Sequence, residues 1–301
     1  MYDSKKGISF FFPSLKKIDT LPFTPSSTCG TQAVSVTGSQ CRLNCKHCGG
    51  LILKNMQDTL TPQALKEAAF RLAQKGSRTI LVSGGADRKG QVPLLDFIQT
   101  IKEIRSDFGL KVLVHTGLVT PQLADGLAEA GIDLAMLDII GDQETIRQVY
   151  HLQASVTDYE HSLKYLVERG IPTAPHVVMG LHFGQIRGEP RALEIIAGYP
   201  IKTLVLVGFR PIPKTAMATF PPPSPEALGE LFVLARRLFP RTPVVLGCER
   251  PLGLHRRKTD LLALQAGLDA ITYPSEKTVQ RVEGQGIPIH YHTDCCALIE
   301  S

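Results

Sequence analysis

The chain has 301 residues, of which 43% are hydrophobic and 20% charged, so it carries enough apolar material for a large core and does not have the composition of a disordered segment. Its formal net charge of +5 is mild. Lys and Arg are dispersed, no stripe of basic and aromatic residues suggests a nucleic-acid surface, and no apolar window approaches the length of a membrane span. We therefore expect no nucleic-acid partner and no membrane.

The densest basic group is His255-Arg256-Arg257-Lys258. We interpret it as a solvated helix start, with docking of an acidic protein or an anionic ligand as the alternative.

The N-terminal segment contains Ile8-Ser9-Phe10-Phe11-Phe12, which Pro13 interrupts. This run is too short for the hydrophobic region of a signal peptide. The seven cysteines show no evident pairing, which is typical of a reducing compartment. We expect a cytoplasmic protein.

Beyond this segment, short apolar runs alternate with amphipathic segments of helical length. The runs with strand composition are residues 33–37, 79–83, 111–115, 132–140, 173–179, 203–207, 244–247 and 269–273. Helices are expected at 61–76, 93–107, 121–130, 143–150, 157–169, 190–197, 225–239 and 258–266.

Eight strands at roughly even spacing, most of them followed by a helix, predict an α/β fold of the TIM type, a (βα)8 barrel. A doubly wound open sheet is the alternative. We expect one domain, with a lead-in over residues 1–32, the barrel over 33–273 and a C-terminal tail over 274–301.

The segment after the first predicted strand carries Cys41, Cys45 and Cys48 within eight residues. Thiolates bind soft metals and iron–sulfur clusters. A structural zinc site normally has a second Cys or His pair, and none follows within the next few dozen residues. The pattern favours a reactive centre with an open fourth position, and a zinc or redox motif is the alternative.

In a barrel of this type, functional residues lie at the carboxyl ends of the strands. The polar and glycine-rich segments at these ends include Gly84-Gly85, Asp138, Met179-Gly180 and Arg210–Met217. Each also has a simpler explanation as turn chemistry or a solvated strand end. We expect His115, His176 and His182 to be structural or to line a substrate site.

The C-x3-C-x2-C spacing, with His47 before the third cysteine, resembles the signature of radical S-adenosylmethionine enzymes. The resemblance implies that Cys41, Cys45 and Cys48 hold a catalytic [4Fe-4S] cluster whose fourth iron binds S-adenosylmethionine, and that the enzyme generates a 5′-deoxyadenosyl radical.

The same resemblance implies further contacts with the cofactor. The glycine pair would contact the methionine amino group, and Asp138 the ribose or sulfonium. The loop around Pro213 is similar to the Pro-rich loop of biotin synthase-like enzymes. The residues expected to bind S-adenosylmethionine are His47, Gly84, Gly85, Asp138, Met179 and Pro213.

Four cysteines remain. Cys29 precedes the first predicted strand and is expected to be a small buried side chain. Cys248 ends the seventh predicted strand, and the tail with Cys295-Cys296 is expected to fold over the same face. Adjacent residues of an extended segment point to opposite sides. We therefore expect Cys248 and one of the tail cysteines to hold an auxiliary iron–sulfur cluster.

The stretches 33–50, 81–87, 246–251 and 266–275 together resemble the two-component lipoyl synthases of archaea and some bacteria. The resemblance implies sulfur insertion into the octanoyl chain of a lipoyl carrier protein, shared with a homologous radical partner subunit. It also implies a ferredoxin- or flavodoxin-type electron donor. The N-terminal C-x4-C-x5-C motif of single-chain lipoyl synthase is missing, which leaves the sulfur source open.

Two alternatives stay open. One is a biotin synthase-like radical enzyme that acts on a free small molecule. The other is a non-enzymatic iron–sulfur scaffold or electron carrier.

Overall fold

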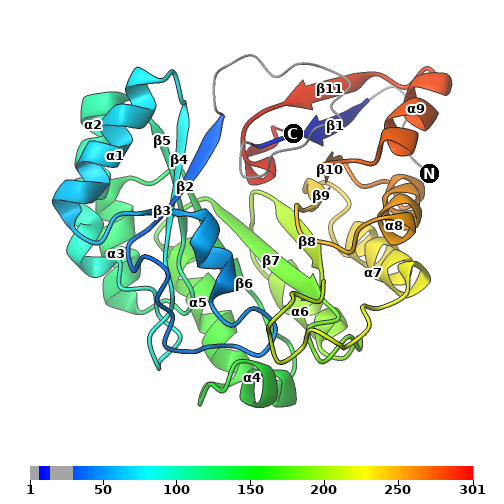
Figure 1. Cartoon of the computed structure of the whole chain (residues 1–301), viewed down its shortest axis with the longest axis horizontal. Helices are drawn as coiled ribbons and strands as arrows, with labels where there is room; N and C mark the ends of the chain where they lie inside the picture. The colour runs from blue at the N-terminus through cyan, green and yellow to red at the C-terminus, as the bar shows by residue number, and fades with distance from the viewer. Residues whose placement is uncertain (1–6, 14–29, 301) are drawn as a thin grey trace.

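The computed structural model describes residues 7–13 and 30–300. Within these ranges the fold is a strongly curled parallel sheet of eleven strands with helices packed on its outer face (Figure 1). The strands are β1 (Ile8–Phe11), β2 (Thr31–Ser35), β3 (Gln57–Asp58), β4 (Thr79–Ser83), β5 (Lys111–His115), β6 (Leu134–Asp138), β7 (Thr173–Met179), β8 (Leu204–Gly208), β9 (Val244–Leu246), β10 (Ala270–Thr272) and β11 (Ile289–His292). The predicted α/β class is confirmed.

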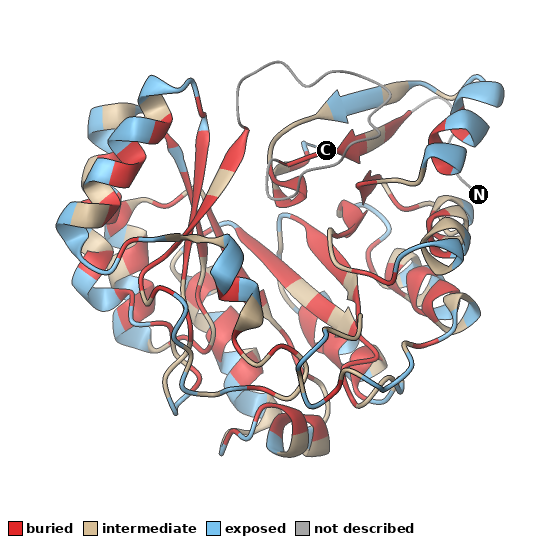
Figure 2. Ribbon diagram, in the orientation of Figure 1, coloured by how far each residue is buried: buried red, intermediate tan, exposed pale blue. Residues whose placement is uncertain are grey.

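The α-helices bury one face against the sheet and expose the other (Figure 2). They are α1 (Pro62–Gln74), α2 (Ile98–Phe108), α3 (Pro121–Ala130), α4 (Gln143–Val149), α5 (Val156–Glu168), α6 (Glu189–Ala197), α7 (Pro225–Leu238), α8 (Leu254–Gln265) and α9 (Glu276–Gly284). Short 3-10 helices lie at Leu51–Asn55, Leu95–Phe97 and Cys296–Leu298. None of the helices in the described ranges has both the length and the hydropathy needed to cross a bilayer.

Several predicted helix starts are confirmed by their caps. Thr61, Thr120 and Ser224 each accept a hydrogen bond from the backbone N–H three residues later, and each is followed by proline at the first helical position. The start of α8 differs from its prediction, because the helix begins at Leu254, four residues before Lys258.

The eight predicted strands all form, but the closed barrel is not confirmed. The sheet order is β11-β1-β10-β9-β8-β7-β6-β5-β4-β2-β3, and no ladder in the described ranges joins β11 to β2 or β3. The reason is β1, which lies inside the predicted lead-in. Ser9 pairs with Ala270 and Phe11 with Thr272, so β1 occupies the edge of β10 that would have to meet β2 in a closed barrel. The sheet is therefore a half-barrel.

The tail covers the amino ends of the strands, not the carboxyl ends as predicted. The amide of Cys295 donates to Thr31 Oγ1 at 2.8 Å, at the first residue of β2. Arg78, directly before β4, lies 3.1 Å from Asp294. The Thr203 hydroxyl, directly before β8, donates to the carbonyl of Ala297 at 3.2 Å. This placement leaves the carboxyl ends of the strands open for a site.

A buried arginine fixes the carboxyl ends of β9 and β10. Arg250 is 1% exposed and forms an ion pair with Asp260 of α8 at 2.8 Å. Its guanidinium also donates to the carbonyls of Gly247, Thr272 and Tyr273. All the polar groups of this pair are thus partnered, as burial of charge requires.

We expect Arg250→Ala to lower the free energy of unfolding by about 3–5 kcal/mol, because it leaves the Asp260 carboxylate buried without its counter-charge. Urea unfolding followed by circular dichroism measures the change. Arg237→Ala, at an exposed position of α7, is the control and should stay within about 0.5 kcal/mol of the wild type. Equal stability of the wild type and Arg250→Ala would contradict this role.

Candidate active site at the carboxyl ends of the strands

The cysteine loop, residues 36–50, leaves the carboxyl end of β2 and is attached to the loop after β4. Thr37 Oγ1 accepts a hydrogen bond from the amide of Gly85 at 2.6 Å and donates to the carbonyl of Gln40 at 2.9 Å. The amide of Arg42 donates to the carbonyl of Ala86 at 2.9 Å. The first cysteine is therefore held directly against the glycine pair.

The second half of the loop is attached to two other segments. The amide of Lys46 donates to the carbonyl of Val149 at the end of α4, at 2.9 Å. The carbonyl of Lys46 accepts from the amide of Met217, in the loop after β8, at 3.2 Å. Segments from three parts of the chain thus position the loop.

The three thiols line one cavity of about 220 Å³. Positive φ angles at Asn44, Gly49 and Gly50 turn the chain around this cavity. Cys45 and Cys48 are buried and Cys41 is half-buried. In the described part of the chain, no three His, Cys, Asp or Glu side chains are grouped to hold a single metal ion.

The thiols influence one another. The hydrogen bond that the Cys45 thiol donates to Cys48 lowers the pKa of Cys48 to about 4, and the same bond raises the pKa of Cys45. A thiolate, the form that binds iron, is therefore favoured at Cys48.

His47 lies beside the thiols. Its ring packs against Tyr150 with 5.2 Å between the centroids, and its Nδ1 is buried without a hydrogen-bond partner. Burial opposes protonation, but the hydrogen bond to Cys48 and the charges of Cys48 and Asp138 outweigh it and raise the pKa of His47. This imidazole has an unused polar atom next to the cavity.

Gly84 and Gly85 both line the cavity, as predicted residues of one site should. A Cβ at position 85 would lie 2.0 Å from the carbonyl oxygen of Gln40 and 2.6 Å from Cα of Cys41. Only glycine lets the two loops approach this closely. The glycine therefore has a packing role, and its predicted contact with the methionine amino group remains a prediction.

Asp138, at the end of β6, also lines the cavity. It accepts a hydrogen bond from the Tyr150 hydroxyl at 3.4 Å, and one of its oxygens lies 3.9 Å from His115 Nε2. Tyr150 and Tyr159 line the same cavity and were not predicted, because neither follows a strand end.

His176, on β7, continues this polar row. Its ring meets that of His115 at 5.5 Å, edge to face. Its Nδ1 lies 2.9 Å from the carbonyl of Ala174, which only accepts, so Nδ1 carries the proton. Burial lowers the pKa of His176 to about 4. The imidazole is therefore neutral near pH 7, and its Nε2 is an acceptor.

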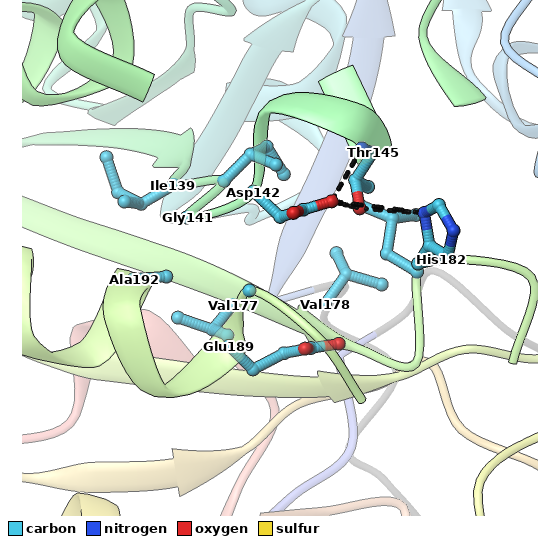
Figure 3. Close-up of a pocket in the computed structure, with 12 residues that line it drawn as sticks. Ile139, Gly141, Asp142, Thr145, Val177, Val178, His182, Glu189 and Ala192 are labelled. Atoms are coloured by element: carbon cyan, nitrogen blue, oxygen red, sulfur yellow. Dashed lines mark hydrogen bonds and ion pairs between the residues drawn. The ribbon is translucent and has the colours of Figure 1, made fainter. Parts of the chain in front are cut away.

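His182 lies outside the cysteine cavity, in a hydrogen-bonded network with Thr145 and Asp142 (Figure 3). It lies 3.1 Å from the hydroxyl of Thr145, which donates to Asp142 at 2.7 Å. Glu189 accepts from the amide of Gly180 at 2.6 Å beside it. The cavity enclosed here is only about 10 Å³, room for a water at most. The network connects the loops after β6 and β7.

The structure does not bring the other predicted residues to the cysteine cavity. Met179 is fully buried in the core, and Pro213 is exposed on the loop after β8. Neither lines the cavity.

The predicted second cysteine set is separated. Cys248 is half-buried after β9, while Cys295 and Cys296 are buried beneath the amino ends of the strands. The tail cysteines also contact each other, and the Cys295 side chain together with burial raises the pKa of Cys296. The expected face is therefore corrected, while the two side chains pack in separate apolar clusters. Cys29 lies outside the described residues.

The half-barrel brings three thiols, a glycine pair and an acidic residue to one cavity, an arrangement that fits a protein with an iron–sulfur cluster. The chain belongs to the Radical SAM superfamily, whose family model matches residues 35–192. Enzymes of this family use a [4Fe-4S] cluster and S-adenosylmethionine. The thiols, the glycines and the unpartnered His47 nitrogen in one cavity fit this pair of cofactors.

Among curated proteins, the chain is similar to biotin synthases. It is 22% identical over 242 residues to that of Acidithiobacillus ferrooxidans, which covers 78% of this chain and 75% of the relative. It is 25% identical over 258 residues to that of Synechococcus, covering 80% and 73%.

Two solved structures share the fold. Methylornithine synthase superposes with a TM-score of 0.61 at 15% identity, covering 86% of this chain and 82% of the other. The [FeFe]-hydrogenase maturase HydG from Carboxydothermus hydrogenoformans superposes with a TM-score of 0.63 at 15% identity, covering 96% and 68%.

We expect Gly85→Ala to prevent cluster assembly while leaving the protein folded, because the added methyl group displaces the Cys41 backbone. Iron content and visible absorption after anaerobic reconstitution measure this, with about four irons per chain expected for the wild type. Gly284→Ala, whose Cβ would meet nothing within 4 Å, is the matched control. A normal cluster in Gly85→Ala would show that the close approach is dispensable.

Proposed function

We propose that this radical S-adenosylmethionine enzyme inserts sulfur into the octanoyl chain of a lipoyl carrier protein, working with a homologous partner subunit. The observation that carries the proposal is the apolar side of the cysteine cavity. Beside the thiols it is lined by Leu43, Ile52, Leu53, Met56, Leu81, Val92, Leu118 and Leu152. An unbranched acyl chain binds well to such a surface, since its burial is driven by the hydrophobic effect.

The residues of the chain have distinct roles in this proposal. Cys41, Cys45 and Cys48 would hold the cluster, and Gly84, Gly85 and Asp138 would bind S-adenosylmethionine. Once bound, the cofactors supply a radical able to take hydrogen from an unactivated C–H bond. The sulfur that replaces this hydrogen would come from the homologous partner subunit, because Cys248 lies apart from the tail cysteines in this chain. Leu53 and Val92, both buried, exclude water from the reacting carbon. A ferredoxin- or flavodoxin-type protein would supply the electron.

A second candidate is a radical enzyme acting on a free small molecule, as the similarity to biotin synthases suggests. The polar row of His115, Asp138 and His176 favours it. Polar side chains on three adjacent strands would bind a substrate with its own hydrogen-bonding groups better than a bare methylene chain.

The reconstituted, reduced protein is expected to cleave S-adenosylmethionine and release 5′-deoxyadenosine, which chromatography detects. Cys48→Ala should abolish this because it removes a cluster ligand, while Cys248→Ala, outside the cavity, should retain it. Reduced protein that binds a cluster but makes no 5′-deoxyadenosine would favour the non-enzymatic scaffold.

Mass spectrometry of an octanoylated carrier domain distinguishes the two enzymatic candidates. We expect a gain of sulfur mass when the chain and its homologous partner act together. Release of 5′-deoxyadenosine without sulfur gain on the carrier, under any pairing, would refute the lipoyl proposal and leave the small-molecule candidate.

A further inference from the structure

Exposed apolar side chains gather at the carboxyl ends of the strands. Of the nine large apolar side chains that are exposed in the described ranges, five lie in segments leading from a strand's carboxyl end to the next helix, and a sixth, Leu254, is the first residue of such a helix. These six are Ile52, Leu60, Leu95, Phe220, Leu252 and Leu254. Leu252 and Leu254, around the start of α8, are 59% and 72% exposed. Single exposed apolar residues are common, whereas a group at the mouth of a site is typical of a binding surface.

Positive charge accompanies this apolar pair. The two segments 209–224 and 247–258 hold the cations Arg210, Lys214, Arg250, Arg256, Arg257 and Lys258 and the single acid Glu249. Arg210 pairs with Glu249 at 3.2 Å, and Arg250 pairs with the buried Asp260. The other four form no ion pair with any described residue. The surface therefore has a local excess of positive charge.

The placement of these cations is unfavourable for the helix. The amino end of a helix carries a partial positive charge, which acidic residues normally offset. Helix α8 has no acidic residue in its first turn, and Gly253 provides no side-chain cap. The Nε atom of Arg256 is buried without a hydrogen-bond partner, and burial lowers the pKa of Arg256. Glu249 and Asp260 offset part of the charge of Arg256, but no described acidic residue forms an ion pair with Arg256, Arg257 or Lys258.

The surface is connected to the cysteine cavity. His255 Nε2 lies 2.7 Å from the carbonyl of Pro223, which joins the start of α8 to the end of the loop after β8. The same loop reaches the cysteine loop through the hydrogen bond from Met217 to Lys46. In Figure 1 this loop runs along the carboxyl ends of the strands, between the cysteine loop and the helices α7 and α8.

We propose that Leu252, Leu254, Arg257 and Lys258, here named the α8 surface, dock the acidic face of the carrier protein that delivers the acyl chain. The two leucines would pack against the carrier and the two cations would pair with its carboxylates. The inference rests on the proposed function and adds the place where the substrate protein binds. Opposite charges of this kind speed association and fix the orientation of the partner.

Binding of an acidic carrier domain with an octanoyl-lysine side chain tests the proposal. Its affinity for the reconstituted protein is measured by fluorescence anisotropy at low and high salt. Arg257→Glu/Lys258→Glu and Leu252→Ser/Leu254→Ser should each weaken binding on the order of tenfold or more, and the charge reversal should also flatten the salt dependence. Arg257 is half-buried and Lys258 exposed, so the charge reversal should still fold.

Lys202→Glu/Arg241→Glu is the matched control. It reverses two exposed cations that lie on the amino-end connections before β8 and β9, and it should bind like the wild type. All variants should release 5′-deoxyadenosine with a short octanoyl-lysine peptide at the wild-type rate, because the peptide does not need the α8 surface.

The outcomes separate the docking from the chemistry. Wild-type affinity in both α8-surface variants, or a wild type that does not bind the carrier, would overturn the docking proposal. If the α8-surface variants lose carrier binding, the docking proposal is supported. If, in the same experiments, the wild type transfers no sulfur to carrier or peptide, the proposed chemistry is refuted.

Discussion

The site depends on backbone hydrogen bonds that other segments make to the cysteine loop. A loop of fifteen residues between β2 and Leu51 has little regular structure of its own, and three thiols share a cluster only if their backbones are held in place. The loop after β4 holds the first cysteine, while α4 and the loop after β8 hold the residues around Lys46. The conformational entropy that the loop loses on ordering is thus offset by hydrogen bonds that form only in the complete fold.

The open sheet separates the molecule into two ends with different roles. At the amino ends, the tail fills the space beneath the strands, where Cys295 and Ala297 pack with Ala33, Leu113 and Ala174. At the carboxyl ends, side chains such as Asp138 and His115 remain half-buried around a cavity. This arrangement stabilises one end through packing and leaves the other available to ligands, as in barrels generally.

Much of the fold could be predicted from periodicity. The strand patterns gave all eight strands of the repeat, and the Thr-Pro and Ser-Pro pairs gave the helix starts, because these signals are local. The position of β1 could not be predicted in this way. Ile8–Phe11 has no neighbour in sequence that shows where it pairs, and its contact with β10 spans almost the whole chain. The position of the tail could not be predicted for the same reason, because its contacts with the strands are distant in sequence.

The site was predictable to a similar extent. Cys41, Cys45 and Cys48 were found from their spacing, and Gly84, Gly85 and Asp138 from their positions at strand ends together with the family resemblance; the structure brings all six to one cavity. Met179 also ends a strand, but its side chain points into the core, since alternate residues of β7 face opposite sides. Tyr150 directly follows α4 and Tyr159 lies in α5, where no comparable signal exists.

Three thiols from one loop are expected to hold a cluster with an open iron for S-adenosylmethionine. Electron paramagnetic resonance of the reduced cluster, recorded with and without S-adenosylmethionine, tests it most directly. The spectrum should change when S-adenosylmethionine is added, because the ligand binds the iron that no cysteine occupies. An unchanged spectrum at saturating S-adenosylmethionine would contradict it.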